Sequence, residues 1–267
     1  MERHKVLLSV APVAAVPHRI DPEEIAEDVC SCAAEGVAMV HLHVRDAQAA
    51  LTPDLTLLGE TVRRIREKCD VIVEVSTGGV SELTIRERCA PCGADYVEAN
   101  SLNVGSVNLG KAVYRNPIEE VEYCVDRILQ NGRLPETELF ELGMIHALKE
   151  LTDRFPFRDP LLLALVFGHE GEMPATRPAL HHMLQFLDET FGSHVCDRAP
   201  ALQYLEGHLE RPEKGRELLW GYTQAGRRDW EMMRYALRQG ADSLRVGFED
   251  SDYLTPERRA GSNAPLI

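Results

Sequence analysis

Two histidines separated by one residue are the sharpest chemical feature of the chain. His41 and His43 lie in the segment VHLHVRD, residues 40–46. In a β-strand, residues i and i+2 point to the same face about 6.6 Å apart, so two imidazoles can converge on one metal ion. Asp46 follows closely, where a carboxylate can orient a ligand histidine. The alternative is two polar side chains that face solvent at a strand end.

A catalytic zinc usually has three protein ligands, so the histidine pair requires a third. Glu249, in the segment RVGFEDSD of residues 245–252, is the candidate we favour, ahead of His169. Arg245 and Asp250 are predicted to pair, because an arginine can hold a carboxylate base ionised and oriented. The alternative here is a solvated acidic loop.

Hydroxyl and glycine residues follow a predicted strand at residues 71–76. Ser76, Thr77 and Gly78 begin the segment STGG, whose hydroxyl and backbone N–H groups suit a carboxylate or a phosphate. The same segment is also typical of a tight turn between a strand and a helix. We interpret the three residues as candidates for substrate binding.

Further polar groups follow later strands. Ser101, Asn103 and Ser106 offer hydrogen-bond donors after the predicted fourth strand. Glu138 is an acid in an apolar run, where an unpaired buried charge is costly, so we expect it to have a partner in the site and assign it to the catalytic group. Gly226 and Arg227 follow the seventh strand, where barrels often bind phosphate. The two arginines at 227 and 228 could equally begin an exposed helix.

The elements that must position these residues alternate along the whole chain. Short β-branched runs alternate with amphipathic stretches, the pattern of parallel βαβ units, and eight strands predict a closed (β/α)₈ TIM barrel with a short or missing final helix. Strands are predicted at residues 5–11, 37–44, 71–76, 94–99, 137–142, 161–167, 217–223 and 242–247. Helices are predicted at residues 22–35, 54–68, 81–90, 117–131, 144–154, 176–191 and 228–239. Two longer irregular segments are expected at residues 101–116 and 192–216.

Length and composition fit one such barrel. The chain has 267 residues, against about 250 for a typical barrel, and no linker divides it, so we expect a single catalytic domain over residues 1–267. The net charge of −14 argues against nucleic-acid binding. The absence of an apolar run of about 20 residues argues against a membrane span and favours a cytoplasmic protein. The odd number of cysteines, seven, predicts reduced thiols.

Taken in order, the motifs resemble those of the β-keto acid cleavage enzymes, the family typified by 3-keto-5-aminohexanoate cleavage enzyme. The resemblance covers nearly the whole chain. Its segments are PEEIAE (22–27), VHLHVRD (40–46), STGG (76–79), SLN (101–103), ELFELG (138–143), MPAT (173–176), GR (226–227) and RVGFED (245–250).

The resemblance implies a zinc-dependent barrel that exchanges acyl groups between a β-keto acid and acetyl-CoA, releasing acetoacetate and a new acyl-CoA. It implies that His41, His43 and Glu249 bind zinc and that Asp250, paired with Arg245, removes a proton from carbon. It places CoA phosphates near Gly226 and Arg227, and it implies a homo-oligomer, a tetramer. Two imidazoles and a carboxylate also accept other divalent ions, such as manganese or cobalt.

The chain differs from the family pattern at several points. Residues 11–18, between the first strand and the first helix, form a shorter segment without an acid. Ser251 stands where asparagine is common, and residues 192–216 look like an insertion. Two alternatives stay open: a metal-dependent hydrolase of the amidohydrolase type, which expects the histidine pair on the first strand, and a catalytically silent barrel that binds small anions.

Overall fold

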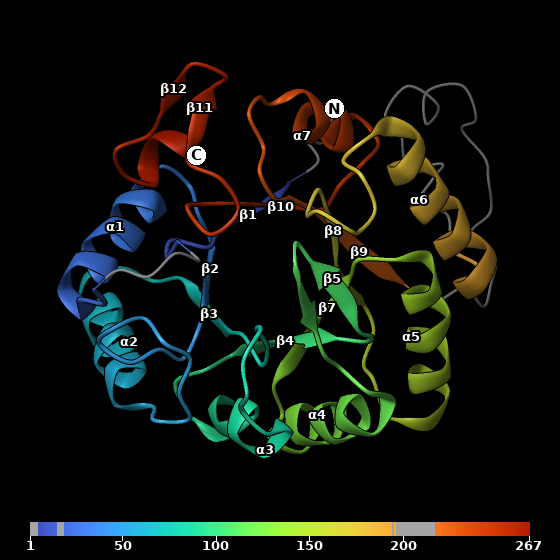
Figure 1. The fold of residues 1–267 in the computed structure, drawn as a ribbon, viewed down its shortest axis with the longest axis horizontal. Coiled ribbons are helices and arrows are strands. Elements are labelled where there is room, and N and C mark those ends of the chain that lie inside the picture. Colours follow the sequence, from blue (N-terminus) through green and yellow to red (C-terminus); the bar gives the residue numbers. More distant parts are fainter. Residues whose placement is uncertain (1–4, 15–18, 194, 196–216) are drawn as a thin grey trace.

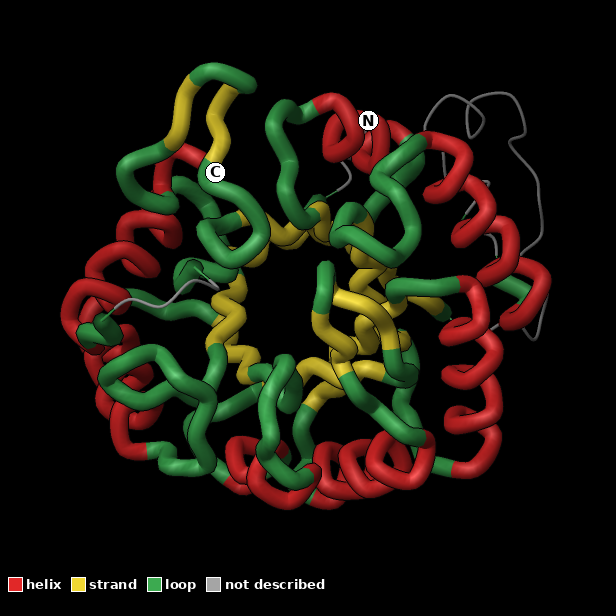
Figure 2. The backbone as a smooth tube through the Cα atoms, in the orientation of Figure 1, coloured by secondary structure: helices red, strands yellow, loops and turns green. Residues whose placement is uncertain are grey.

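Eight parallel strands close into a barrel in the computed structural model, which describes residues 5–14, 19–193, 195 and 217–267. The order around the barrel is β1-β10-β9-β8-β7-β4-β3-β2, and Figure 2 shows this ring surrounded by helices. The TIM barrel expected from the sequence is therefore confirmed. Its strands are β1 (Leu7–Val10), β2 (Met39–Leu42), β3 (Ile72–Val75), β4 (Ala99–Asn103), β7 (Leu134–Leu139), β8 (Leu161–Phe167), β9 (Leu218–Gln224) and β10 (Ser243–Val246).

Helices follow most of the strands and form the outer layer (Figure 1). The first begins as its sequence predicts, because the Asp21 side chain accepts hydrogen bonds from the backbone N–H groups of Glu23 and Glu24. The helices are α1 (Pro22–Ala34), α2 (Thr56–Lys68), α3 (Ile85–Arg88), α4 (Ile118–Gln130), α5 (Leu142–Arg154), α6 (Arg177–Phe191) and α7 (Glu231–Arg238). None of the helices in the described ranges has the length and apolar character that crossing a membrane requires.

Strand alternation separates an apolar outer surface of the barrel from a polar interior at the site. On β3, Val73 and Val75 are fully buried and belong to the apolar cluster that includes residues of α1 and α2. Glu74 lies between them in the strand and points to the opposite face, where it contacts His41. Barrel interiors are usually filled with branched apolar side chains. Buried charged side chains inside this barrel therefore indicate a functional site.

Two strands lie away from their predicted ranges. The fourth strand is at Ala99–Asn103 because Ala90–Gly93 form a 3₁₀ helix and Val97 N–H closes a turn on the Ala94 carbonyl. The fifth strand begins at Leu134 and includes Pro135, a residue that ordinarily argues against a central strand. Its apolar run continues directly into α5, so the predicted strand included the start of a helix.

The C-terminal part has no eighth outer α-helix, as predicted. Residues after β10 instead form a hairpin and a short 3₁₀ helix, namely β11 (Tyr253–Thr255), β12 (Arg258–Arg259) and Ala264–Leu266. The segment 101–116 is more regular than expected, since it contains the hairpin of β5 (Val107–Leu109) and β6 (Ala112–Tyr114). Most of the segment 192–216 lies outside the described residues.

One cysteine prediction is wrong. Cys30 on α1 and Cys69 at the end of α2 form a disulfide, with their Cα atoms 5.6 Å apart. The two helices are neighbours in the outer layer, so residues 39 positions apart in the sequence come within bonding distance. The other described cysteines, Cys32, Cys89, Cys92 and Cys124, are buried free thiols, as expected.

Candidate metal centre and active site

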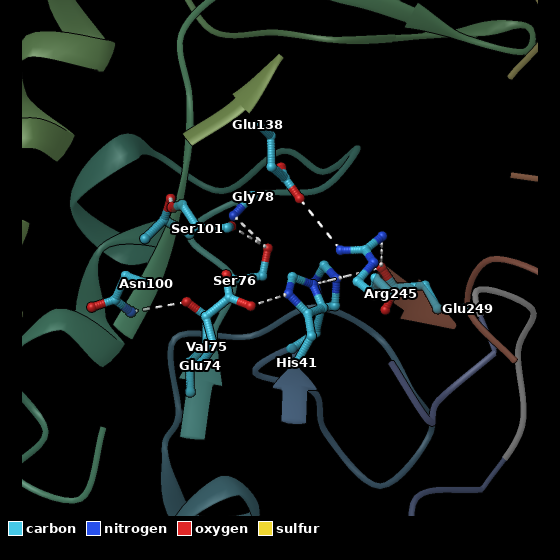
Figure 3. A network of polar contacts seen from close by, with 12 residues as sticks. His41, Glu74, Val75, Ser76, Gly78, Asn100, Ser101, Glu138, Arg245 and Glu249 are labelled. Carbon is cyan, nitrogen blue, oxygen red and sulfur yellow. Dashed lines mark hydrogen bonds and ion pairs between the residues drawn. The ribbon is translucent and has the colours of Figure 1, made fainter. Parts of the chain in front are cut away.

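His41 on β2, His43 directly after this strand and Glu249 after β10 meet at one point. Figure 3 shows His41 and Glu249 in this cluster. The Nε2 atoms of His41 and His43 are 3.4 Å apart. Oε1 of Glu249 lies 3.3 Å from Nε2 of His43 and 3.6 Å from Nε2 of His41. Strands β2 and β10 both pair with β1, which brings together residues more than 200 positions apart in the sequence.

These three atoms fit the ligand set of a divalent cation. Ligands about 2.0–2.2 Å from a tetrahedral zinc lie roughly 3.3–3.6 Å from one another, which matches the separations found here. His41 Nδ1 lies 2.9 Å from Glu74 Oε2, and the tautomer that donates its Nδ1–H there presents a lone pair on Nε2. These nitrogen and carboxylate oxygen atoms converge closely enough to hold a divalent cation between them.

Glu74 is the functional residue that the sequence reasoning missed. Its side chain is fully buried, and its hydrogen bond sets the tautomer and orientation of the His41 ring. We expected Asp46 in this role, but its carboxylate accepts hydrogen bonds from backbone N–H groups of its own turn, those of Gln48 and Ala50. The signal was present, because Glu74 is an acid in an apolar strand, as Glu138 is.

A second buried carboxyl group, that of Glu136, lies close to Glu74 and His41. Glu136 on β7 is 4% exposed, and its carboxylate lies within 4.8 Å of the ring nitrogen of His41 and of the Glu74 carboxylate. Burial raises the pKa of Glu74 to about 8, and the negative charge of Glu138 adds to this effect. Burial also raises the pKa of Glu136, with a further contribution from Glu74. His41 therefore lies beside two buried carboxyl groups, those of Glu74 and Glu136.

A glycine turn positions Glu249. Gly247 has φ +135°, and a Cβ at this position would come within 2.2 Å of the Ala11 carbonyl oxygen, so only glycine fits. The N–H of Glu249 donates to the same carbonyl at 3.1 Å, and the N–H of Asp250 donates to the Gly247 carbonyl. Burial opposes ionisation of Glu249, but the charges of His43 and His41 outweigh it and hold the pKa of the carboxyl group well below its usual range.

Arg245 connects three carboxylates. Its Nε and one terminal nitrogen contact the two oxygens of Asp250 at 3.1 and 2.7 Å, a bidentate pair. Its other terminal nitrogen lies 3.5 Å from Oε1 of Glu138. Burial opposes the guanidinium charge, but Asp250 and Glu249 outweigh it, so the pKa of Arg245 is well above its usual value. The Asp250 carboxylate is thus oriented beside the cluster of His41, His43 and Glu249.

Ser76 and Asn103 each have a side-chain hydrogen-bond donor that no described residue accepts from, and Ser101 contacts Ser76. Ser76 is 7% exposed, and its hydroxyl oxygen accepts hydrogen bonds from Gly78 N–H and the Ser101 hydroxyl, which leaves its own hydrogen free to donate. Asn103 accepts from the N–H of Gly105, while its buried Nδ2 has no partner among the described residues. Figure 3 places Ser76 and Ser101 near His41 and Glu138.

Two predicted substrate residues, Thr77 and Gly78, use their hydrogen-bond donors within the loops. The Thr77 hydroxyl donates its single hydrogen to the Ser101 carbonyl at 2.7 Å, and the side chain is 2% exposed, so it cannot donate to a substrate. The Gly78 N–H is already paired with Ser76. The exposed Ser106 accepts a hydrogen bond from the backbone N–H of Asn116, which leaves its own hydroxyl hydrogen free to donate, so its role toward the substrate stays a prediction. Side-chain direction in these loops could not be deduced from residue type.

The two residues expected near CoA differ in exposure. Gly226 is exposed, and its N–H donates to the Asp250 carbonyl at 2.8 Å. Arg227 is 1% exposed, and its guanidinium stacks on the Trp230 ring, 3.6 Å from the centroid. Burial lowers the pKa of Arg227, although the negative charges of Asp250 and Asp229 oppose this effect. Its terminal nitrogens have no hydrogen-bond partner in the described chain. Arg227 is thus buried beside Trp230, and its assignment to CoA phosphates stays a prediction. His169 pairs with Glu172 at 2.8 Å, away from the cluster.

Comparison with known proteins identifies the family. Residues 9–267 match the family described as beta-keto acid cleavage enzyme. The chain belongs to this family. The match covers almost all of the chain, and it favours the family over the amidohydrolase alternative. The family match and the names of the relatives show that this chain is an enzyme.

Several characterised proteins are similar to this family member. A 3,5-dioxohexanoate:acetyl-CoA acetone transferase from Paraburkholderia graminis is 26% identical, over 99% of this chain and 88% of that protein. A 3-keto-5-aminohexanoate cleavage enzyme from Fusobacterium nucleatum is 29% identical, over 95% of this chain and 82% of that protein. A 3-oxoadipate:acetyl-CoA acetyltransferase from Cupriavidus necator is 28% identical, over 98% and 85%.

Solved structures support the barrel fold. The complex of ObcA with oxaloacetate superposes with a TM-score of 0.66 at 19% identity. The superposition covers 92% of this chain but only 61% of ObcA, so the chain spans about three fifths of that protein. At this identity the similarity concerns the fold alone.

Proposed function

We propose that this chain is a zinc-dependent enzyme that exchanges acyl groups between a β-keto acid and acetyl-CoA. The observation that carries the proposal is the convergence of His41, His43 and Glu249 beside a carboxylate held by Arg245. The names of the relatives support this chemistry, since two of those reported above combine a keto acid with acetyl-CoA. Zinc is favoured by the separation of the three ligand atoms and by the two imidazoles.

Bound zinc would polarise the ketone oxygen of the substrate and so acidify the carbon between ketone and carboxylate. Asp250 is the base that removes a proton from this carbon. Its bidentate pair with Arg245 fixes the orientation of the carboxylate. Glu138, which contacts the same guanidinium, fixes Arg245 from the other side.

Ser76 and Asn103 would hold the substrate carboxylate through the free hydroxyl hydrogen and the unpaired amide nitrogen, and Ser101 positions Ser76. The deprotonated carbon then attacks the thioester carbonyl, CoA moves to the other acyl carbon, and a retro-Claisen step breaks the carbon–carbon bond. The overall exchange converts RCOCH₂COO⁻ and CH₃CO–SCoA into RCO–SCoA and CH₃COCH₂COO⁻. Atoms and charge balance without an added oxidant or reductant.

The test is to incubate zinc-loaded protein with acetyl-CoA and a panel of β-keto acids while measuring acetoacetate and the new acyl-CoA. We expect the two products in equal amounts from at least one acid. A folded, metal-bound protein that forms neither product with any acid of the panel would instead support the silent, anion-binding barrel. Loading with manganese or cobalt would test the preference for zinc.

We further propose that residues 1–267 act as one catalytic domain and that the protein assembles as a homo-oligomer, a tetramer, in the cytoplasm. The support is the match to one family over residues 9–267 and the resemblance described above. Light scattering coupled to size-exclusion chromatography measures the assembly directly, and a monomer would refute that part of the proposal.

A further inference from the structure

A cavity of about 470 Å³ lies between α7 and the C-terminal hairpin, outside the metal cluster. Its size is within the range of pockets that bind small molecules. The lining combines an aromatic ring, apolar side chains and basic groups. The residues important to the argument are Trp230, Arg234, Arg238, Leu254, Thr255 and Pro256.

The two cations of its lining outnumber the one carboxylate that has no ion pair among the described residues, Asp229. Asp229 and Glu231 also line the cavity, but Asp229 accepts a hydrogen bond from the N–H of Glu231, and Glu231 forms an ion pair with Arg177 at 2.7 Å. Arg234 and Arg238 are one turn apart on α7, are exposed, and have no ion-pair partner in the part of the chain that the structure describes. Both guanidinium groups are therefore available to an anion.

The cavity is connected to the catalytic loops. The Trp230 ring that lines it carries the buried guanidinium of Arg227 on one face. Ser251 donates a hydrogen bond to the Arg227 carbonyl, and Gly226 N–H donates to the Asp250 carbonyl. The cavity thus borders the loops that follow β9 and β10, the seventh and eighth strands of the barrel, where barrels often bind phosphate.

We propose that this cavity binds the phosphorylated adenosine end of CoA, with Arg234 and Arg238 contacting its phosphates. The inference rests on the proposed function, which requires a CoA thioester whose phosphates lie far from its reacting carbon. A chain with a net charge of −14 must concentrate positive charge where it binds such an anion. Trp230, together with Leu254 and Pro256, supplies apolar surface for the purine.

Calorimetry tests the assignment without depending on turnover. CoA, dephospho-CoA and adenosine 3′,5′-bisphosphate are titrated into the full chain, its Arg234→Ala/Arg238→Ala variant, and a control variant, Arg63→Ala/Arg86→Ala. The control removes the same charge from exposed positions on α2 and α3. We expect the first variant to lose about 100-fold in affinity for CoA and the bisphosphate, about tenfold for each arginine, while the control binds like the parent.

Equal affinities in the parent and the Arg234→Ala/Arg238→Ala variant would overturn the assignment, as would a parent that binds neither CoA nor the bisphosphate. A second readout is the ratio of kcat/KM for acetyl-CoA to that for acetyl-pantetheine, which lacks the nucleotide. We expect this ratio to fall in the variant, and an unchanged ratio would contradict the proposal. A parent that binds CoA through this cavity but exchanges no acyl group would refute the proposed function alone.

Discussion

Replacing Glu74 with alanine tests whether the buried acid behind His41 controls metal binding. The hydrogen bond between Glu74 and His41 is 2.9 Å long, and both side chains are at most 1% exposed, so no water replaces the lost acceptor. Without it, the ring can rotate or adopt the other tautomer. Partners of this kind contribute about 10- to 100-fold in metal affinity, which corresponds to about 1.4–2.7 kcal/mol. We expect a loss of this size in Glu74→Ala.

Two further variants make the test specific. In Glu74→Gln the amide oxygen can still accept the Nδ1–H of His41, so we expect a smaller loss, below about tenfold. Val75 is the next residue on β3, and its fully buried side chain lies on the opposite face of the strand. The Val75→Ala variant therefore creates a cavity away from His41, and we expect it to bind metal like the parent. Agreement among the three variants would assign the effect to the hydrogen bond rather than to the packing of β3.

Metal affinity is measured by competition with a chromophoric zinc chelator, and the cobalt form is followed by its visible absorption. Thermal unfolding of each variant verifies that it is folded. The reasoning would be refuted by a Glu74→Ala protein that binds zinc as tightly as the parent. A loss of equal size in Val75→Ala would refute it as well, because the effect would then come from packing.

Three other substitutions give distinct outcomes. Asp250→Asn should keep its metal, measured by elemental analysis, while turnover falls by about 10²–10⁴-fold, the usual contribution of a general base. Loss of the metal as well would contradict that role. Gly247→Ala places a Cβ against the Ala11 carbonyl oxygen at positive φ, so we expect denaturant unfolding to show a loss of at least about 1–3 kcal/mol, together with weaker zinc binding. Cys30→Ser removes the cross-link to Cys69 and should lower the free energy of unfolding by about 3–4 kcal/mol under non-reducing conditions. If reductant does not change the midpoint of unfolding of the parent in guanidinium chloride, the result would argue against the disulfide.

The local pattern of the chain was sufficient to predict the architecture and several candidate positions. Spacing along a strand places His41 and His43 on one face because side chains alternate with a period of two. Glu249, Asp250 and Arg245 lie within one short segment, so covalent connection keeps them near one another. Eight alternating units predict a barrel, and a barrel places the C-terminal ends of its strands at one rim.

The partners of these residues depended on tertiary structure. Glu74 faces His41 because β2 and β3 pair in the register that puts these two residues side by side. Arg227 is buried on Trp230, and Cys30 meets Cys69, because loops and helices pack against one another in ways that residue type does not reveal. Alternation within a strand is a property of a few consecutive residues, whereas register and packing arise from contacts between distant segments. The tertiary fold alone therefore decided which polar groups face one another.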